Sequence, residues 1–209
     1  YLLENDPSLR VLIIEKEFCG YGASGRNGGW CEGALAGGTE KYAKRSTMGE
    51  ALRLERTMFE TVDEIQRVLD SEDINCDFHK GGFVSVARNL PQAQRQRSAV
   101  ELARERGTGE EIIRILDADE ARAHVNASNV HSGIFFAPSA VVDPGKMVRG
   151  LAKAVERKGG TIVEGTTALS ISTGKVVCVE GVVSADVIVQ ATEGLSLIHI
   201  SEPTRRTSI

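Results

Sequence analysis

Two spacings of apolar residues dominate the first third of the chain and predict two kinds of element. Residues 11–14 are four consecutive apolar residues, three of them β-branched, which is typical of a strand buried on both faces of a parallel sheet. Residues 1–6 before this strand read as the end of a helix, with Pro7 marking the break. Farther along, apolar residues recur every three or four positions from Leu52 to Leu69, so we predict a long helix with a core-facing stripe.

The pattern changes between residues 76 and 142, where short strand-like runs alternate with polar helices. Residues 78–87 contain a turn and an alternating strand, and Pro91 opens a polar helix that ends near Gly107. The sequence Asp-Ala-Asp-Glu at 117–120 resembles a capping box, and residues 131–136 predict another strand. Together these features predict an antiparallel α+β segment.

Residues 143–194 predict a helix followed by strands, which indicates that the chain returns to its first sheet. The predicted elements are a helix that begins at Asp143-Pro144, buries Met147, Val148, Leu151 and Val155 and ends at Gly159-Gly160; strands at 161–164 and 167–172; a hairpin near Gly174 and Gly181; and a buried strand at 185–192.

Candidate chemistry lies directly after the first predicted strand. Glu15 ends this strand, where doubly wound nucleotide-binding folds place the carboxylate that accepts hydrogen bonds from a ribose. Five glycines then fall within residues 20–29, and glycine lets the backbone approach a phosphate or a flat ring closely. A glycine loop alone is more often a simple turn, so the spacing by itself decides nothing.

The order of these features is more specific than any one of them. A buried strand, a terminal glutamate and the sequence Gly-Ala-Ser-Gly-Arg-Asn-Gly-Gly at 22–29 resemble the D-amino-acid oxidase-like family of FAD-dependent oxidoreductases, in particular its gamma-glutamylputrescine oxidase group. In that family the first strand and a G-x-G-x-x-G turn precede the strand that ends in glutamate, and this chain contains neither. The resemblance therefore implies that both lie upstream of residue 1.

The resemblance also implies a fold and a division into domains. The expected class is α/β, an incomplete FAD-binding Rossmann-like domain with an inserted antiparallel α+β substrate domain. The expected parts are the first portion of the FAD-binding domain at 1–75, a substrate-domain segment at 76–142, and the return to the FAD-binding domain at 143–194.

Carried over residue by residue, the resemblance predicts the cofactor site. Glu15 is expected on the ribose, the glycine loop beside the phosphates and the flavin, Ala168 on the adenine side, and a turn at 191–194 over the cofactor. The predicted cofactor-binding residues are Glu15, Lys16, Ala23, Ser24, Arg26, Asn27, Gly28, Gly29, Ala168, Ala191 and Thr192. Arg26 has a competing interpretation as a solvated surface charge.

The expected reaction is oxidation of the C–N bond of an amine or amino acid to an imine, which then hydrolyses. The hydride passes to non-covalently bound FAD, and oxygen or another acceptor takes the electrons. No catalytic residue is assigned, and this chain alone is expected to bind FAD poorly and to be inactive. Two alternatives stay open: a flavoprotein that oxidises a different carbon centre, and a non-catalytic chain completed by a partner subunit.

Composition and motif content narrow the remaining classes of function and of site. A net charge of −4 gives no electrostatic footprint for nucleic acid, and no apolar run is long enough to span a membrane. The four cysteines are far apart and, like the histidines, share no metal-ligand spacing, so we predict free thiols, no metal site and a cytoplasmic location. No Ser-His-Asp order or H-E-x-x-H sequence supports a hydrolase.

The last fifteen residues, 195–209, do not continue the family pattern. Residues 195–205 are matched by in-frame codons of a transposon-based sequencing adapter, so we interpret 195–209 as adapter-derived and exclude His199 from any site. The competing interpretation is a natural polar tail.

Overall fold

The computed structural model of the chain describes residues 1–192, which form two compact units. The first unit combines residues 1–26 with those from Val148 onward, and the second unit contains Asn27–Met147. These units divide the chain at other positions than the predicted domains, whose boundaries stay a prediction. The predicted adapter-derived segment, residues 195–209, lies outside the described residues.

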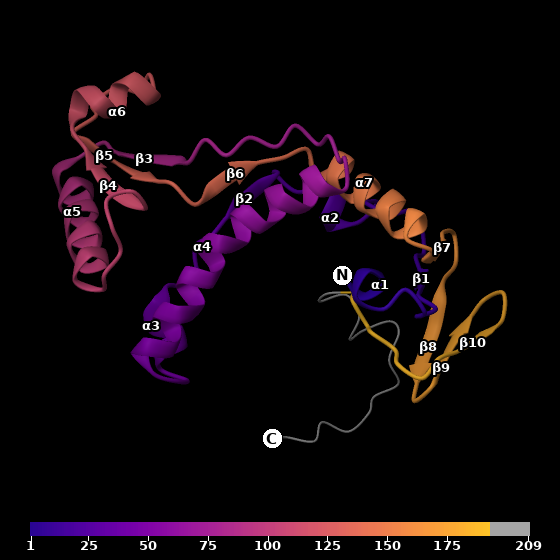
Figure 1. Cartoon of the computed structure of the whole chain (residues 1–209). Coiled ribbons are helices and arrows are strands. Elements are labelled where there is room, and N and C mark those ends of the chain that lie inside the picture. Colours follow the sequence, from indigo (N-terminus) through magenta and orange to yellow (C-terminus); the bar gives the residue numbers. More distant parts are fainter. Residues whose placement is uncertain (193–209) are drawn as a thin grey trace. The chain divides into compact units, whose positions relative to one another are not determined.

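The first unit contains a parallel strand pair and an antiparallel meander (Figure 1). Strand β1 pairs in parallel with β7, with Leu12 opposite Thr161, and β8, β9 and β10 follow one another in antiparallel order. Its elements are α1 (Leu2–Asn5), β1 (Leu12–Ile14), α2 (Ala23–Arg26), β7 (Thr161–Val163), β8 (Ala168–Ser172), β9 (Lys175–Cys178) and β10 (Val182–Ser184).

Helix α7 (Pro144–Arg157) begins as the sequence predicts. The Asp143 carboxylate accepts a hydrogen bond from the Lys146 backbone N–H at 2.9 Å, and Gly159 adopts a φ of +87° after the last turn. One residue of the predicted buried face is wrong: Leu151 is exposed, and Ala154 is buried instead. The Leu151 side chain is 39% exposed.

Two predictions of buried strands are wrong. β1 forms, but Leu12 and Ile13 are 42% and 37% exposed, because among the described residues it pairs only with β7. Residues 185–192 form no strand, and Val187 and Val189 are each 78% exposed. A run of β-branched residues becomes a strand only where a neighbouring strand supplies a ladder of hydrogen bonds, and no strand of the described residues pairs with this segment.

The second unit is built around two antiparallel sheets with helices packed against them (Figure 1). One sheet has the order β3-β5-β4, and the other pairs β2 with β6. Its elements are β2 (Trp30–Glu32), α3 (Thr39–Ala43), α4 (Met48–Ser71), β3 (Phe83–Ala87), α5 (Leu90–Glu105), β4 (Ile113–Leu116), α6 (Ala118–His124), β5 (Ser132–Phe136) and β6 (Ser139–Val141). The predicted long helix, polar helix and antiparallel strands are all confirmed, while β2, β4 and β6 were not foreseen.

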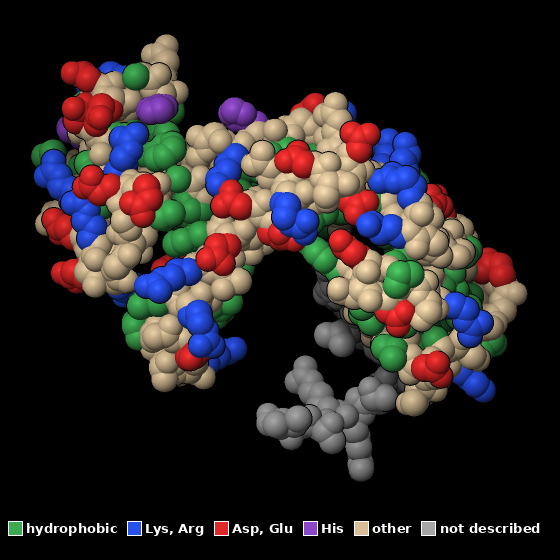
Figure 2. Space-filling view, in the orientation of Figure 1, with side chains coloured by type: hydrophobic (Ala, Val, Ile, Leu, Met, Phe, Trp, Pro, Cys, Tyr) green, Lys and Arg blue, Asp and Glu red, His purple; other side chains and the backbone are tan. Residues whose placement is uncertain are grey.

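The core of the second unit lies between α6 and the three-stranded sheet. Leu116, Ala121 and Val130 are buried there, and Phe135 packs against them. On α4, Val62 and Leu69 of the predicted apolar stripe are also buried. On the face shown in Figure 2, acidic and basic side chains are intermixed over both units.

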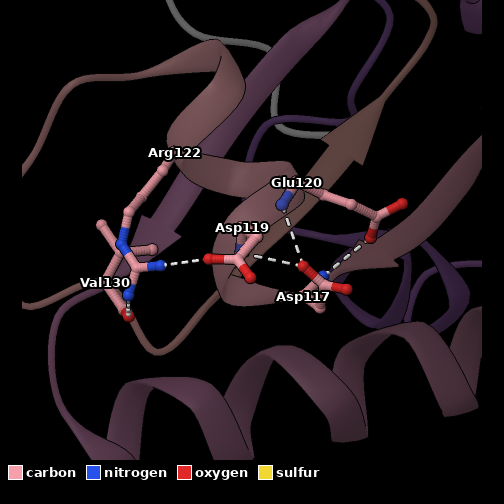
Figure 3. Close-up of polar contacts among 5 residues, drawn as sticks. All are labelled: Asp117, Asp119, Glu120, Arg122 and Val130. Atoms are coloured by element: carbon pink, nitrogen blue, oxygen red, sulfur yellow. Dashed lines mark hydrogen bonds and ion pairs between the residues drawn. The ribbon is translucent and has the colours of Figure 1, made fainter.

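The predicted capping box is present at the start of α6 (Figure 3). Asp117 Oδ1 accepts hydrogen bonds from the N–H groups of Asp119 and Glu120 at 2.8 and 2.9 Å, and Glu120 Oε2 accepts one from the Asp117 N–H at 2.8 Å. Arg122 donates to the Asp119 carboxylate at 2.5 Å and to the Val130 carbonyl at 3.3 Å. These bonds fix the start of a helix whose Ala121 is fully buried.

Replacing Asp117 by alanine is therefore expected to lower the free energy of unfolding by about 1–2 kcal/mol, because two helix N–H groups lose their acceptor. Urea denaturation followed by circular dichroism measures this change. The matched control is Asp119→Ala, which removes only an exposed ion pair and should cost about 0.5 kcal/mol or less. Equal losses in the two variants would contradict a role for the cap.

Candidate functional site

Glu15 occupies the carboxyl end of β1, as predicted. Its backbone N–H donates to the Val163 carbonyl at 2.9 Å, and its carbonyl accepts from the Thr166 N–H at 3.0 Å, so the main chain is fixed on both sides. The half-buried carboxylate accepts a hydrogen bond from the Glu17 N–H at 3.0 Å through Oε1. No other hydrogen bond or ion pair of this carboxylate occurs within residues 1–192, which leaves Oε2 available to a ligand.

A second carboxylate, Glu164, lies at the same edge and was not predicted as a site residue. Glu164 directly follows β7 as Glu15 directly follows β1, and its Oε1 accepts a hydrogen bond from the Cys19 backbone N–H at 2.8 Å. Burial, a side-chain hydrogen bond to Glu164 and the nearby carboxylates raise the pKa of the Cys19 thiol. The signal was present in the sequence, since two parallel strands that each end in glutamate place both acids at one edge.

The next part of the loop forms the single-turn helix α2, which contains Ala23, Ser24 and Arg26. The Arg26 guanidinium lies over the Tyr21 ring, 4.9 Å from its centroid, and Nε donates weakly to the Gly22 carbonyl at 3.5 Å. The Tyr21 ring makes an edge contact with the Phe18 ring at 5.3 Å. Arg26 is therefore held in place by an aromatic ring while its side chain stays exposed.

The glycines of the loop fall into two classes. A Cβ on Gly25 would overlap the Gly20 carbonyl oxygen, and a Cβ on Gly29, whose φ is +72°, would overlap the Val142 carbonyl oxygen. Both positions thus require glycine for folding. A Cβ on Gly22 or Gly28 would meet no atom within 4 Å, and neither residue has a positive φ. Packing and conformation give no reason for glycine at these two positions, which fits a backbone left open for a ligand.

The other predicted cofactor residues lie as follows. Lys16 is exposed and forms a 3.9 Å ion pair with Glu17. Asn27 Oδ1 accepts a hydrogen bond from the Gly29 N–H at 2.8 Å, and both residues belong to the second unit. Ala168 begins β8, two residues beyond the Thr166 that bonds Glu15.

Ala191 and Thr192 lie at the end of the described chain and are exposed. The Thr192 hydroxyl accepts a 3.4 Å hydrogen bond from the Gln190 amide. The rest of the predicted turn, residues 193–194, lies outside the described residues. Within the first unit the structure thus brings Glu15 close to the start of β8, and no hydrogen bond among residues 1–192 joins Ala191 or Thr192 to Glu15.

Residues 1–192 contain no cluster of three His, Cys, Asp or Glu side chains that could hold a metal ion, and no helix among them is long and apolar enough to cross a membrane. Cys19, Cys31, Cys76 and Cys178 are free thiols. Burial raises the pKa of Cys31, and it is the leading cause of the raised pKa of Cys76.

Known proteins resemble this chain over most of its length. The sequence profile of the DAO family, described as FAD dependent oxidoreductase, matches residues 1–207. The probable oxidoreductase OrdL of Haemophilus influenzae is 28% identical over 187 residues, which are 86% of this chain and 42% of that protein. The gamma-glutamylputrescine oxidoreductase of Escherichia coli is 28% identical over 156 residues, 74% of this chain and 35% of that protein.

Solved structures show the same fold. L-Proline dehydrogenase from P. horikoshii superposes with a TM-score of 0.71 at 16% identity and covers 91% of this chain and 48% of its own. Glycine oxidase from Geobacillus kaustophilus gives 0.65 at 21% identity, covering 85% and 47%. L-alpha-Glycerophosphate oxidase from Mycoplasma pneumoniae, with FAD bound, gives 0.58 at 17% identity, covering 84% and 44%.

The chain thus spans less than half the length of each of these five proteins. The structural likenesses confirm the predicted α/β fold, and the family profile confirms the predicted resemblance. The chain belongs to the DAO family of FAD-dependent oxidoreductases.

Proposed function

We propose that the protein carrying this chain oxidises the C–N bond of an amine or amino acid to an imine, which then hydrolyses in water. Membership in a family of FAD-dependent oxidoreductases supports the redox chemistry. Two similar proteins, gamma-glutamylputrescine oxidoreductase and glycine oxidase, are named for nitrogen-bearing substrates, which supports an amine or amino acid as the substrate here. When bound, FAD accepts the hydride from the carbon that carries the nitrogen, and oxygen or another acceptor later takes the electrons.

The observation that carries the cofactor assignment is Glu15 at the carboxyl edge of two parallel strands, with one carboxylate oxygen unused by the described residues. This is the position from which a carboxylate accepts hydrogen bonds from a ribose. Gly22 and Gly28 leave the loop backbone open, and the exposed guanidinium of Arg26 supplies positive charge for a phosphate or the flavin edge. The proposed site is completed by Lys16, Ala23, Ser24, Asn27, Gly29, Ala168, Ala191 and Thr192.

This chain by itself is proposed to bind FAD weakly and to carry out no turnover, because it spans less than half of the similar proteins. We also propose a cytoplasmic location and no nucleic-acid partner, as the separated free cysteines and the net charge of −4 predict.

Anaerobic flavin reduction tests the proposed reaction. The flavin-loaded protein is mixed without oxygen with a panel of primary amines, amino acids, alcohols and 2-hydroxy acids, and the loss of oxidised-flavin absorbance is followed. In a second assay, in air, the release of ammonia is measured. Amines or amino acids should bleach the flavin and yield ammonia. Bleaching by alcohols or hydroxy acids without bleaching by amines would contradict the proposal.

That second outcome defines the alternative function, oxidation of a different carbon centre. It is favoured by one observation, the likeness of the fold to L-alpha-glycerophosphate oxidase, which is named for a polyol phosphate that contains no nitrogen. The alternative predicts flavin reduction by a polyol phosphate and no ammonia.

A further inference from the structure

The two-stranded sheet of the second unit has two chemically different faces. The register pairs Trp30 with Val141 and Glu32 with Ser139, so these four side chains share one face, while Cys31 and Ala140 share the other. Backbone hydrogen bonds join Val142 to Gly29 and Gly33 to Pro138. The Trp30–Val141 and Glu32–Ser139 pairs are therefore the non-hydrogen-bonded pairs, in which facing side chains come closest.

Helix α4 lies against β2 (Figure 1), and the contacts of Gly33 place it on the Cys31 face. Gly33 continues the alternation of Cys31, and a Cβ placed on it would lie 2.8 Å from the Met58 carbonyl oxygen and 3.1 Å from the Phe59 Cα. Ala140 on this face is buried accordingly. The opposite face carries the side chains of Trp30, Glu32, Ser139 and Val141, and we call it the Trp30 face. Trp30, Glu32 and Val141 are exposed on it, whereas Ser139 is buried.

The Trp30 face combines apolar surface with unused polar groups. Trp30 is 68% exposed and Val141 is 47% exposed, and the Trp30 ring lies against the Phe83 ring at a centroid distance of 5.8 Å. Glu32 is exposed and makes no hydrogen bond or ion pair within residues 1–192. Across from it, the buried Ser139 hydroxyl is the one buried side-chain polar atom in the described residues that lacks a hydrogen-bond partner.

These groups match one ligand chemistry. An indole ring attracts both a carbon chain and a cation. An unpaired carboxylate attracts an ammonium group and repels another carboxylate. A hydroxyl without a partner can accept or donate one hydrogen bond. Trp30 also directly follows Gly29, the end of the loop proposed to lie beside the flavin.

We propose that the Trp30 face holds the substrate, binding the carbon chain of an alkylamine on Trp30 and Val141 and an ammonium group at Glu32. This inference rests on the proposed function and makes it more specific: Glu32 selects amines over amino acids of the same chain length, because the α-carboxylate of an amino acid would be repelled.

The chain's only tryptophan is Trp30, so its fluorescence reports binding at this face directly and needs no flavin. The 209-residue chain is titrated with n-hexylamine, and with hexanoate as the matched probe of opposite charge. Hexylamine should change the emission saturably at millimolar concentration, and hexanoate should bind several-fold more weakly. Glu32→Gln should weaken hexylamine about three- to fivefold, as expected for one exposed charge pair. The control is Glu101→Gln, which removes an exposed charge on α5 of the same unit and should change nothing.

Turnover provides the second readout. In the flavin-loaded protein, Glu32→Gln should lower the ratio of kcat/KM for hexylamine to that for norleucine about three- to fivefold, with the control variant unchanged. Equal emission changes with hexylamine and hexanoate, no response to either, or equal effects of the two variants would overturn the inference. Amine oxidation that Glu32→Gln leaves unchanged would overturn the inference and leave the proposed function standing. Binding that favours hexylamine over hexanoate, without any amine oxidation, would overturn the proposed function and leave the ligand preference of the Trp30 face standing.

Discussion

Replacing Gly29 by alanine is expected to lower the free energy of unfolding of the second unit by about 3 kcal/mol. Two effects add at this residue. The φ of +72° is costly for any residue with a Cβ, by about 1–2 kcal/mol, and the new Cβ would overlap the Val142 carbonyl oxygen, where overpacking costs about 1–3 kcal/mol. The clash also falls where Val142 donates its hydrogen bond to the Gly29 carbonyl, so the start of the β2–β6 pair should be lost. Urea denaturation measures the change.

The neighbouring glycine provides a matched control that separates folding from binding. Gly28→Ala adds the same methyl group into open space at a residue without positive φ, so its unfolding free energy should change by about 0.5 kcal/mol or less. FAD affinity should nevertheless fall about tenfold or more, because the methyl group occupies the space through which we propose the cofactor approaches the backbone. Unchanged FAD affinity in a stably folded Gly28→Ala protein would remove Gly28 from the site.

Replacing Glu15 by glutamine should weaken FAD binding about tenfold, equivalent to about 1.4 kcal/mol, because charge-assisted hydrogen bonds to the ribose become neutral ones. Glutamine keeps an oxygen that can accept the Glu17 N–H bond, so the local turn should survive and stability should change little. Titration of the apoprotein with FAD, followed by quenching of flavin fluorescence, gives the dissociation constants.

Glu17→Gln is the control for Glu15→Gln. Glu17 lies two residues away and is exposed, and among residues 1–192 its carboxylate makes one ion pair, at 3.9 Å with Lys16. The substitution therefore changes the net charge equally without changing the side chain at the end of β1. FAD affinity should stay within about twofold of the unmodified protein. A similar loss in both variants would mean that Glu15 acts only through general electrostatics and does not bind the ribose.

Local sequence signals predicted the elements whose stability is local. The capping box at Asp117, the N-cap at Asp143 and the glycine stop after α7 each depend on residues within one or two turns. The amphipathic spacing that defines α4 likewise needs only its own residues. Glu15 could be placed because it directly follows the first strong apolar run.

Elements that depend on distant partners could not be predicted in this way. The strands β2 and β6 have three residues each and exist because Trp30 meets Val141, a pairing that no local pattern announces. The apolar run at 185–192 is the reverse case, since it favours a strand but no strand within residues 1–192 pairs with it. The two classes of loop glycine could not be distinguished from the sequence either. Only the structure shows whether a Cβ would meet a carbonyl oxygen or open space at each position.

The discontinuity of the first unit has a consequence for how the protein forms during synthesis. Strand β1 leaves the ribosome about 150 residues before its partner β7, a delay of about 8–30 s at roughly 5–20 residues per second. All of the second unit is made in that interval, and its strands pair within one continuous stretch. We therefore expect the nascent chain to fold from the middle outward, with Leu12 and Ile13 exposed until translation reaches β7, and chaperones that bind apolar segments should recognise β1 during that time.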